Sequence, residues 1–234
     1  MKENLEGATQ VAMWDGQYDL AHHEGNANLW GDPHVPYAEV AARRFAENSA
    51  SVVLDLPCGD GRNLPALSAG APILLAADTS PTAMAIAAEV AEKAGIRDKT
   101  VFVQLNAFAT GLLDDSIDGI YAWDLLGHLT KPGDALREFY RVLRPGGSLI
   151  SNVWTMNDCQ VVDPNVTSIG DKEYVDHFGF YCRHYDRESL NAMLESAGLV
   201  PELIEVASWI DPAHAHYRTY EHRHESFVIT IRKH

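Results

Sequence analysis

The 234-residue sequence predicts a doubly wound α/β fold built on a mostly parallel sheet of seven strands. Short apolar runs rich in β-branched residues alternate along the chain with segments of helical character, which is typical of βαβ units. One such run, at 52–56, leads into a turn of proline and glycines and then into a helical segment from Asn63. A strand, a glycine turn and a helix in this order open a nucleotide-binding α/β unit.

The remaining elements follow from apolar runs and from helix start and stop signals. After the strand at 52–56, further strands are expected at 72–77, 100–105, 117–123, 148–153, 199–207 and 226–231. Helices are expected at 38–47, from Asn63, from near Pro81, from Arg137 to the Pro-Gly-Gly stop at Gly147, and at 187–196. Asp186 and Gly198 fit as the caps of the last helix.

Asp55 narrows the kind of ligand that the first turn would hold. It lies two residues before a turn that contains Pro57, Gly59 and Gly61. A loop that holds a pyrophosphate should not carry an acid there, because like charges repel. A carboxylate suits a ligand with a cationic amine instead. S-adenosylmethionine (SAM) is such a ligand, since its methionine end carries an ammonium group and its sulfur is a sulfonium.

The segment from Asp55 to Gly61 resembles motif I of the class I SAM-dependent methyltransferases, whose usual form is Asp/Glu-x-Gly-x-Gly-x-Gly. Pro57 replaces the first glycine, which a φ of about −65° would permit, whereas Gly59 and Gly61 match. Later motifs follow in the order of that family, and the resemblance covers residues 50–155 well. It implies a class I methyltransferase fold, in which the last of the seven strands is antiparallel.

The resemblance also implies which residues bind the cofactor. Asp78, at the end of the second predicted strand, would accept hydrogen bonds from the ribose hydroxyls, although it could instead cap the helix that follows. Asn106 and Ala107 would lie at the adenine amino group. Residues 124–129 resemble motif IV, which faces both the methionine end of SAM and the acceptor. The cofactor-binding set is Asp55, Pro57, Gly59, Gly61, Arg62, Asp78, Thr79, Asn106, Ala107, Asp124 and Leu125.

Three aromatic-rich regions leave the strand–helix alternation, at 1–37, 154–182 and 208–224. In an open parallel sheet, ligands bind beyond the carboxyl ends of the strands, so these regions suit lids over an apolar small molecule. The aromatic residues could instead seal the faces of the sheet. We expect a single domain, with an N-terminal cap at 1–45 and a Rossmann-like core at 46–234. The substrate-side candidates are Trp14, Tyr18, Trp30, Trp154, His222 and His224.

Histidines supply the candidates for acid–base chemistry. Methyl transfer from a sulfonium is an in-line displacement, so the protein mainly positions the acceptor. An oxygen or nitrogen acceptor can also need a general base, and His128 lies just past motif IV. A histidine at this place is also common in the family without a catalytic role.

Two His-x-His pairs raise the question of a metal. In a strand, His222 and His224 would place both imidazoles on one face, an arrangement that can chelate a metal. No cysteine or acid at clear ligand spacing completes a site, although Asp211, Glu221 and Glu225 are near. No metal is therefore expected, and surface histidines are favoured over a base that faces the substrate; the same holds for the other pair, His214 and His216.

Composition excludes several classes of partner. The chain has 18 Lys and Arg against 33 Asp and Glu, a net charge of −15 that would repel a nucleic acid backbone. No run approaches the ~20 apolar residues of a membrane span. Three cysteines without a CxxC motif, and a start without a signal-peptide core, favour a cytoplasmic protein. The sequence does not predict an oligomeric state.

The sequence therefore predicts an enzyme that transfers a methyl group from SAM to an oxygen or nitrogen atom of a small-molecule acceptor. Two other classes remain as alternatives. One is a SAM-binding sensor or partner subunit without transferase activity. The other is an NAD-dependent oxidoreductase, which Asp55 and the leucine at position 64 disfavour, since Leu64 occupies the third glycine place of Gly-x-Gly-x-x-Gly.

The first prediction concerns the cofactor. SAM and its product S-adenosylhomocysteine should bind with micromolar affinity or better, about −8 kcal/mol, whereas NAD should not bind. Titration calorimetry measures both ligands directly. Tighter binding of NAD than of S-adenosylhomocysteine would contradict the family assignment.

Overall fold

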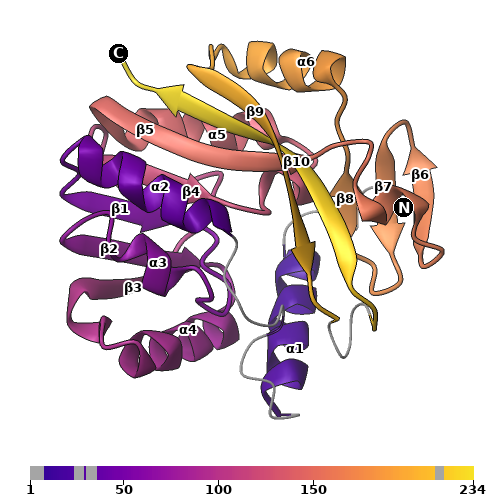
Figure 1. Cartoon of the computed structure of the whole chain (residues 1–234), viewed down its shortest axis with the longest axis horizontal. Helices are drawn as coiled ribbons and strands as arrows, with labels where there is room; N and C mark the ends of the chain where they lie inside the picture. Colours follow the sequence, from indigo (N-terminus) through magenta and orange to yellow (C-terminus); the bar gives the residue numbers. More distant parts are fainter. Residues whose placement is uncertain (1–7, 24–28, 30–35, 214–218) are drawn as a thin grey trace.

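The computed structural model describes residues 8–23, 29, 36–213 and 219–234. Its centre is a seven-stranded sheet with the strand order β3-β2-β1-β4-β5-β10-β9 (Figure 1). These strands are β1 (Val52–Asp55), β2 (Ile73–Asp78), β3 (Thr100–Gln104), β4 (Ile117–Ala122), β5 (Leu143–Trp154), β9 (Leu203–Asp211) and β10 (His222–Arg232). Strands β1 to β5 pair in parallel, and β10 is antiparallel to both of its neighbours. The predicted sheet is confirmed.

Helices cover both faces of this sheet. They are α2 (Pro36–Glu47), α3 (Leu64–Leu67) and α4 (Pro81–Lys93) in one apolar cluster, and α5 (Pro132–Val142) and α6 (Arg187–Ala197) in the other. Val53 of β1 packs in the cluster that contains Phe45, whereas the next residue, Leu54, packs in the cluster that contains Phe139. Because successive side chains of a strand point to opposite faces, one buried apolar strand joins both cores.

Several element ends differ from the sequence prediction. The helix after the first turn has only four residues, and a 3₁₀ turn, η2 (Arg97–Lys99), precedes β3. Strand β5 begins at Leu143 because Ile117 pairs with it, and the register then shifts so that Gly119 pairs with Ser148. The Arg-Pro-Gly-Gly sequence therefore forms an irregularity within the strand and not a loop before it.

The region 208–224 was predicted to leave the sheet, and this prediction is wrong at both ends. Residues up to Asp211 belong to β9 and residues from His222 belong to β10, where these two residues face each other across the antiparallel pair. The two strands pair continuously from there to Leu203 opposite Thr230. Cross-strand pairing thus extends the hairpin to the edge where ligands bind.

The region 154–182 forms a second, smaller sheet beside the first one (Figure 1). It contains a 3₁₀ turn, η4 (Cys159–Val162), and the antiparallel strands β6 (Val166–Gly170), β7 (Glu173–Asp176) and β8 (Tyr181–Arg183). Helix α1 (Ala8–His23) lies below the carboxyl ends of the central strands. None of the described helices combines the length and apolar character needed to cross a bilayer.

The first turn gives a prediction about stability. Gly61 has φ +86°, and a Cβ there would lie 2.8 Å from Ala87 Cα of helix α4, whereas Gly95 has φ +68° and no described atom within 4 Å of such a Cβ. Both alanine variants incur backbone strain, but only Gly61→Ala also overpacks the core. Gly61→Ala should therefore lower the free energy of unfolding by at least about 1 kcal/mol more than Gly95→Ala. Urea denaturation measures the free energy of unfolding of both variants. Equal decreases would show that helix α4 shifts to accommodate the Cβ at position 61 without loss of stability.

Candidate active site

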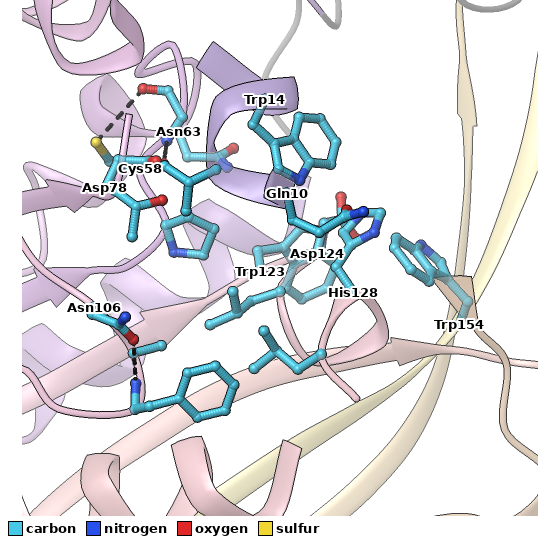
Figure 2. Close-up of a pocket in the computed structure, with 18 of the residues that line it drawn as sticks. Gln10, Trp14, Cys58, Asn63, Asp78, Asn106, Trp123, Asp124, His128 and Trp154 are labelled. Carbon is cyan, nitrogen blue, oxygen red and sulfur yellow. Dashed lines mark hydrogen bonds between the residues drawn. The ribbon is translucent and has the colours of Figure 1, made fainter. Parts of the chain in front are cut away.

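One cavity of about 910 Å³ opens at the carboxyl ends of β1, β2 and β4 (Figure 2). Figure 2 shows Asp78 and Asn106 on one side of it and Trp14, His128 and Trp154 on the other. The predicted residues that line it are Pro57, Gly59, Arg62, Asp78, Thr79, Asn106, Ala107, Asp124, Leu125, His128, Trp14, Tyr18, Trp154, His222 and His224. Among the described residues that form its wall, Asp55 and Gly61 do not appear, and Trp30 lies outside the described residues.

The first turn is fixed to the end of β2 by backbone hydrogen bonds. The Cys58 N–H donates to the Ala77 carbonyl at 2.8 Å, and the Gly59 N–H donates to Asp78 Oδ2 at 3.0 Å. Gly59 has φ +51°, and a Cβ there would lie 2.8 Å from the hydroxyl oxygen of Tyr18. Glycine is therefore needed both for the turn and for the close approach of α1.

Asp78 occupies the place at which ribose hydroxyls would be bound. Its Oδ1 accepts from the Ser80 N–H at 2.9 Å, and Ser80 itself caps helix α4 by accepting from the Ala83 N–H. The alternative role of Asp78 as the cap of that helix is therefore taken by Ser80. Burial raises the pKa of Asp78 above its usual range. A carboxylate oxygen can accept more than one hydrogen bond, so both oxygens retain capacity for a ligand.

Asp55 lies buried at the end of β1, and neither of its oxygens has a hydrogen-bond partner within the described part of the chain. Burial, followed by the charge of Asp78, raises the pKa of Asp55 well above its ordinary value. An unsatisfied buried carboxyl group is costly. A bound cation nearby would offset that cost, so the residue fits the cationic ligand that the sequence predicts, although it forms no part of the cavity wall.

Asp124 follows β4 in a strained backbone conformation, with φ +52°. Asn152 of β5 holds it on two sides: its Oδ1 accepts from the Asp124 N–H at 2.7 Å, and its Nδ2 donates to Asp124 Oδ1 at 2.8 Å. Arg62 lies 3.7 Å from Asp124 and 4.0 Å from Asp211. Burial raises the pKa of Asp124, and the Arg62 charge opposes that rise. Arg62 thus holds a positive charge between two carboxylates in the cavity wall.

His128 closes the short 3₁₀ turn η3 (Leu126–His128) after β4. Its Nδ1 lies 2.7 Å from the Tyr181 carbonyl oxygen of β8. A carbonyl only accepts, so Nδ1 carries the proton and Nε2 of the neutral ring carries the lone pair. Burial lowers the pKa of His128 below its usual value, which keeps the ring neutral near pH 7. The geometry and charge state are those of a general base.

Aromatic rings from three segments surround His128. Trp14 of α1 stacks on Phe180, with ring centroids 3.9 Å apart and an interplanar angle of 18°. The rings of Trp14 and Trp154 meet His128 edge-on at 5.1 and 4.8 Å. A hydrogen bond also joins helix α1 to the start of α4, because Asp15 Oδ1 accepts from Ser80 Oγ at 2.5 Å. The predicted cap and the region 154–182 therefore build one apolar wall of the cavity.

Several residues of the site were not identified from the sequence. They are Asp60, Asn63, Phe108, Gln160 and Asp211, which line the cavity, and Asn152 and Phe180, which hold lining residues in place. Asp211 was noted only as a neighbour of the histidines. Its position opposite His222 depends on the register of β9 and β10, which local sequence patterns do not specify.

Comparison with known proteins agrees with this geometry. Residues 54–151 match the protein family described as a methyltransferase domain. The methyltransferase GfsG of Streptomyces halstedii is 31% identical over 131 residues, which cover 51% of this chain but only 47% of GfsG. The 27-O-demethylrifamycin SV methyltransferase of Amycolatopsis mediterranei is 28% identical over 83% of this chain and 75% of that enzyme.

A solved structure shows the same fold. The 1,6-didemethyltoxoflavin-N1-methyltransferase of Burkholderia thailandensis, with S-adenosylhomocysteine bound, superposes with a TM-score of 0.62 over 95% of this chain and 88% of that chain, at 23% identity. The domain match, the sheet order and the motif residues define a class I methyltransferase domain. Residues 54–151 therefore carry a methyltransferase domain within a class I methyltransferase fold, and the chain spans about half the length of GfsG.

The position of Asp78 gives a prediction about cofactor affinity. Asp78→Asn keeps the size of the side chain and one acceptor oxygen but loses the charge. It should therefore weaken the hydrogen bonds to the ribose, since a charge-assisted hydrogen bond contributes on the order of 1.5–3 kcal/mol. The dissociation constant of S-adenosylhomocysteine should rise at least about tenfold.

The matched control is the exposed Asp98, for which Asp98→Asn should leave the dissociation constant unchanged. Titration calorimetry on both folded variants measures the two dissociation constants. If Asp78→Asn binds S-adenosylhomocysteine as tightly as the wild type, Asp78 only fixes the turn and the start of α4.

Proposed function

We propose that the protein transfers the methyl group of SAM to an oxygen or nitrogen atom of a small, largely apolar acceptor. The observation that carries this proposal is the neutral His128, fixed through Nδ1 to the Tyr181 carbonyl, in the same cavity as the cofactor residues. An oxygen or nitrogen acceptor loses a proton when it is methylated, and the lone pair on Nε2 of His128 can accept that proton. The names of two relatives, a rifamycin O-methyltransferase and an N1-methyltransferase, support the same acceptor atoms.

The chain's own residues would divide the work along the cavity. SAM supplies a methyl group that is already activated by the sulfonium charge. Asp78 and Asn106 hold the nucleoside end, and Arg62 faces the methionine end. Trp14 and Trp154 exclude water and orient the acceptor, and His128 takes its proton at Nε2. Positioning of this kind lowers the barrier to in-line displacement without any covalent intermediate.

Product formation tests the proposal directly. The protein is incubated with methyl-labelled SAM and a metabolite extract of its host, and the labelled product is identified by mass spectrometry. A labelled O-methyl or N-methyl compound, formed together with S-adenosylhomocysteine, is the expected result. Tight binding of SAM without any transferred label would favour the alternative of a SAM-binding sensor or partner subunit.

The base assignment predicts the effect of removing His128. His128→Gln should lower kcat about 10²- to 10⁴-fold near neutral pH, while the dissociation constant of S-adenosylhomocysteine stays the same. The exposed His177, in the turn after β7, provides the control, for which His177→Gln should change neither quantity.

The pH profile gives a second readout of the same residue. The base is active when deprotonated, and its pKa lies below the ordinary value of 6.5. The wild-type rate should therefore be retained at neutral pH and fall only as the pH drops below 6.5. A rate that is unaffected by His128→Gln at every pH would leave His128 a purely structural residue.

A further inference from the structure

Asp211, His222 and His224 converge on the acceptor side of the cavity, outside the residues assigned to the cofactor. We propose that these three side chains bind a divalent first-row transition-metal ion such as zinc, and that the ion holds an oxygen atom of the acceptor. The second half of this proposal rests on the proposed function, whereas the metal site itself does not.

The pairing of β9 with β10 brings the three residues together. His222 lies directly opposite Asp211 in the antiparallel register, and His224 projects from the same face of β10 two residues later. One ligand atom from each residue lies within 4.8 Å of the others, and His224 Nε2 is 3.8 Å from Asp211 Oδ2. Bonds of ~2.0–2.2 Å to a shared ion place donor atoms about 3 Å apart, so small side-chain movements suffice.

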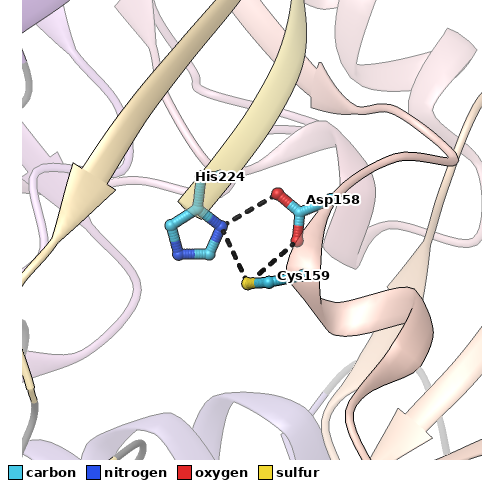
Figure 3. A group of neighbouring side chains, drawn as sticks. All are labelled: Asp158, Cys159 and His224. Atoms are coloured by element: carbon cyan, nitrogen blue, oxygen red, sulfur yellow. Dashed lines mark hydrogen bonds and ion pairs between the residues drawn. The ribbon is translucent and has the colours of Figure 1, made fainter. Parts of the chain in front are cut away.

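Both imidazoles are fixed through Nδ1, so Nε2 would be the atom that binds a metal. His222 Nδ1 lies 2.9 Å from the Tyr220 carbonyl oxygen and therefore donates to it. His224 Nδ1 lies 2.9 Å from Asp158 Oδ2. Figure 3 shows the other nitrogen of His224 on the far side of the ring from Asp158. Metal-bound histidines almost always have their second nitrogen fixed by a carboxylate or a carbonyl in this way.

A neighbouring group of Asp158, Cys159 and His224 is a weaker candidate for the same ion (Figure 3). Its histidine atom would be Nδ1, which already contacts the carboxylate. Both oxygens of Asp158 also accept backbone N–H groups, from Gln160 and from Glu225, so this carboxylate has a structural task. Neither Asp158 nor Cys159 is among the described residues that line the cavity, whereas Asp211, His222 and His224 all are.

The donor set selects the kind of ion. Two imidazoles and one carboxylate suit zinc, iron, cobalt or nickel, whereas magnesium and calcium prefer sites made of oxygen alone. Three protein ligands leave at least one position open for a further oxygen ligand. The side chains of His222 and His224 are almost fully buried, and both line the ligand cavity. The open coordination position would therefore face a ligand in the cavity.

Arg62 connects this group to the cofactor, since it lies 4.0 Å from Asp211 and 3.7 Å from Asp124. A hydroxyl bound to the ion would therefore lie near the methionine end of SAM, and the ion would lower the hydroxyl pKa. In the reaction, the hydroxyl proton passes to His128. The oxygen then forms a bond to the methyl carbon while the carbon–sulfur bond breaks, and that electron pair stays on sulfur as the neutral thioether of S-adenosylhomocysteine.

The test uses the full chain, freed of metal by chelation and titrated with Co²⁺ and with Zn²⁺. Wild type should bind one Co²⁺ with visible d–d absorption bands, and Zn²⁺ should displace it. Asp211→Asn and His224→Gln should each raise the dissociation constant at least about tenfold. His177→Gln and Cys159→Ser should bind as the wild type does.

Three outcomes would overturn the proposal. Folded wild type that binds neither ion would make the group a metal-free cluster in which His224 pairs with Asp158 and Asp211. A thiolate-to-cobalt absorption band that disappears in Cys159→Ser would place the ion on the neighbouring group. Unchanged affinity in Asp211→Asn, the less buried and more conservative of the two variants, would place it elsewhere.

The melting temperature of each metal-free variant shows whether it is folded, and Asp211→Asn keeps the proposal testable if His224→Gln does not fold. S-adenosylhomocysteine binding is measured on the same samples. Cofactor binding and methyl transfer without any metal binding would reject only the metal site. Metal and cofactor binding without transfer to any acceptor would reject only the proposed function.

Discussion

The burial of carboxyl groups at one edge of the sheet is the constraint on which the site depends. Parallel pairing places the ends of β1, β2 and β4 side by side, and each carries an aspartate: the buried Asp55 and Asp78, and the half-buried Asp124 just after β4. Such groups are costly to bury unless they are satisfied. Backbone N–H groups satisfy Asp78, and Asn152 with Arg62 satisfies Asp124. Asp55 has no such partner within the described chain, and the positive charge of a bound SAM would offset the cost of its burial.

The two halves of the cavity have different structural origins. The cofactor half is formed by the strand ends and the glycine turn, which the core fixes through residues such as Val53 and Leu54. The acceptor half is formed by α1, the small sheet and the β9–β10 hairpin, which are additions to that core. Under the proposed function, the first half would determine the class of chemistry, and the second half would determine which molecule is methylated.

Sequence patterns predicted the central sheet because its strands leave local signals, and most residues that the family resemblance implies for the cofactor line the cavity. Apolar runs located all seven strands, with Gly59 in the turn after β1 and Asp78 at the end of β2. The acceptor half depends on contacts between distant segments. The pairing of Asp211 with His222 follows from strand register, and the packing of Trp14 on Phe180 joins residues 166 positions apart. Neither arrangement leaves a periodic pattern in the chain.

The central claim is that the positive charge of a bound cofactor offsets the burial of Asp55 and Asp78 at the strand ends. Calorimetry of S-adenosylhomocysteine binding at about pH 6, in two buffers of different ionisation enthalpy, measures the protons exchanged. Burial raises the pKa values of Asp55 and Asp78 in the free protein, and a ligand that donates to or pairs with the ionised groups lowers them. The account predicts a net release of protons, smaller in Asp55→Asn. Equal heats in both buffers for the wild type would contradict it.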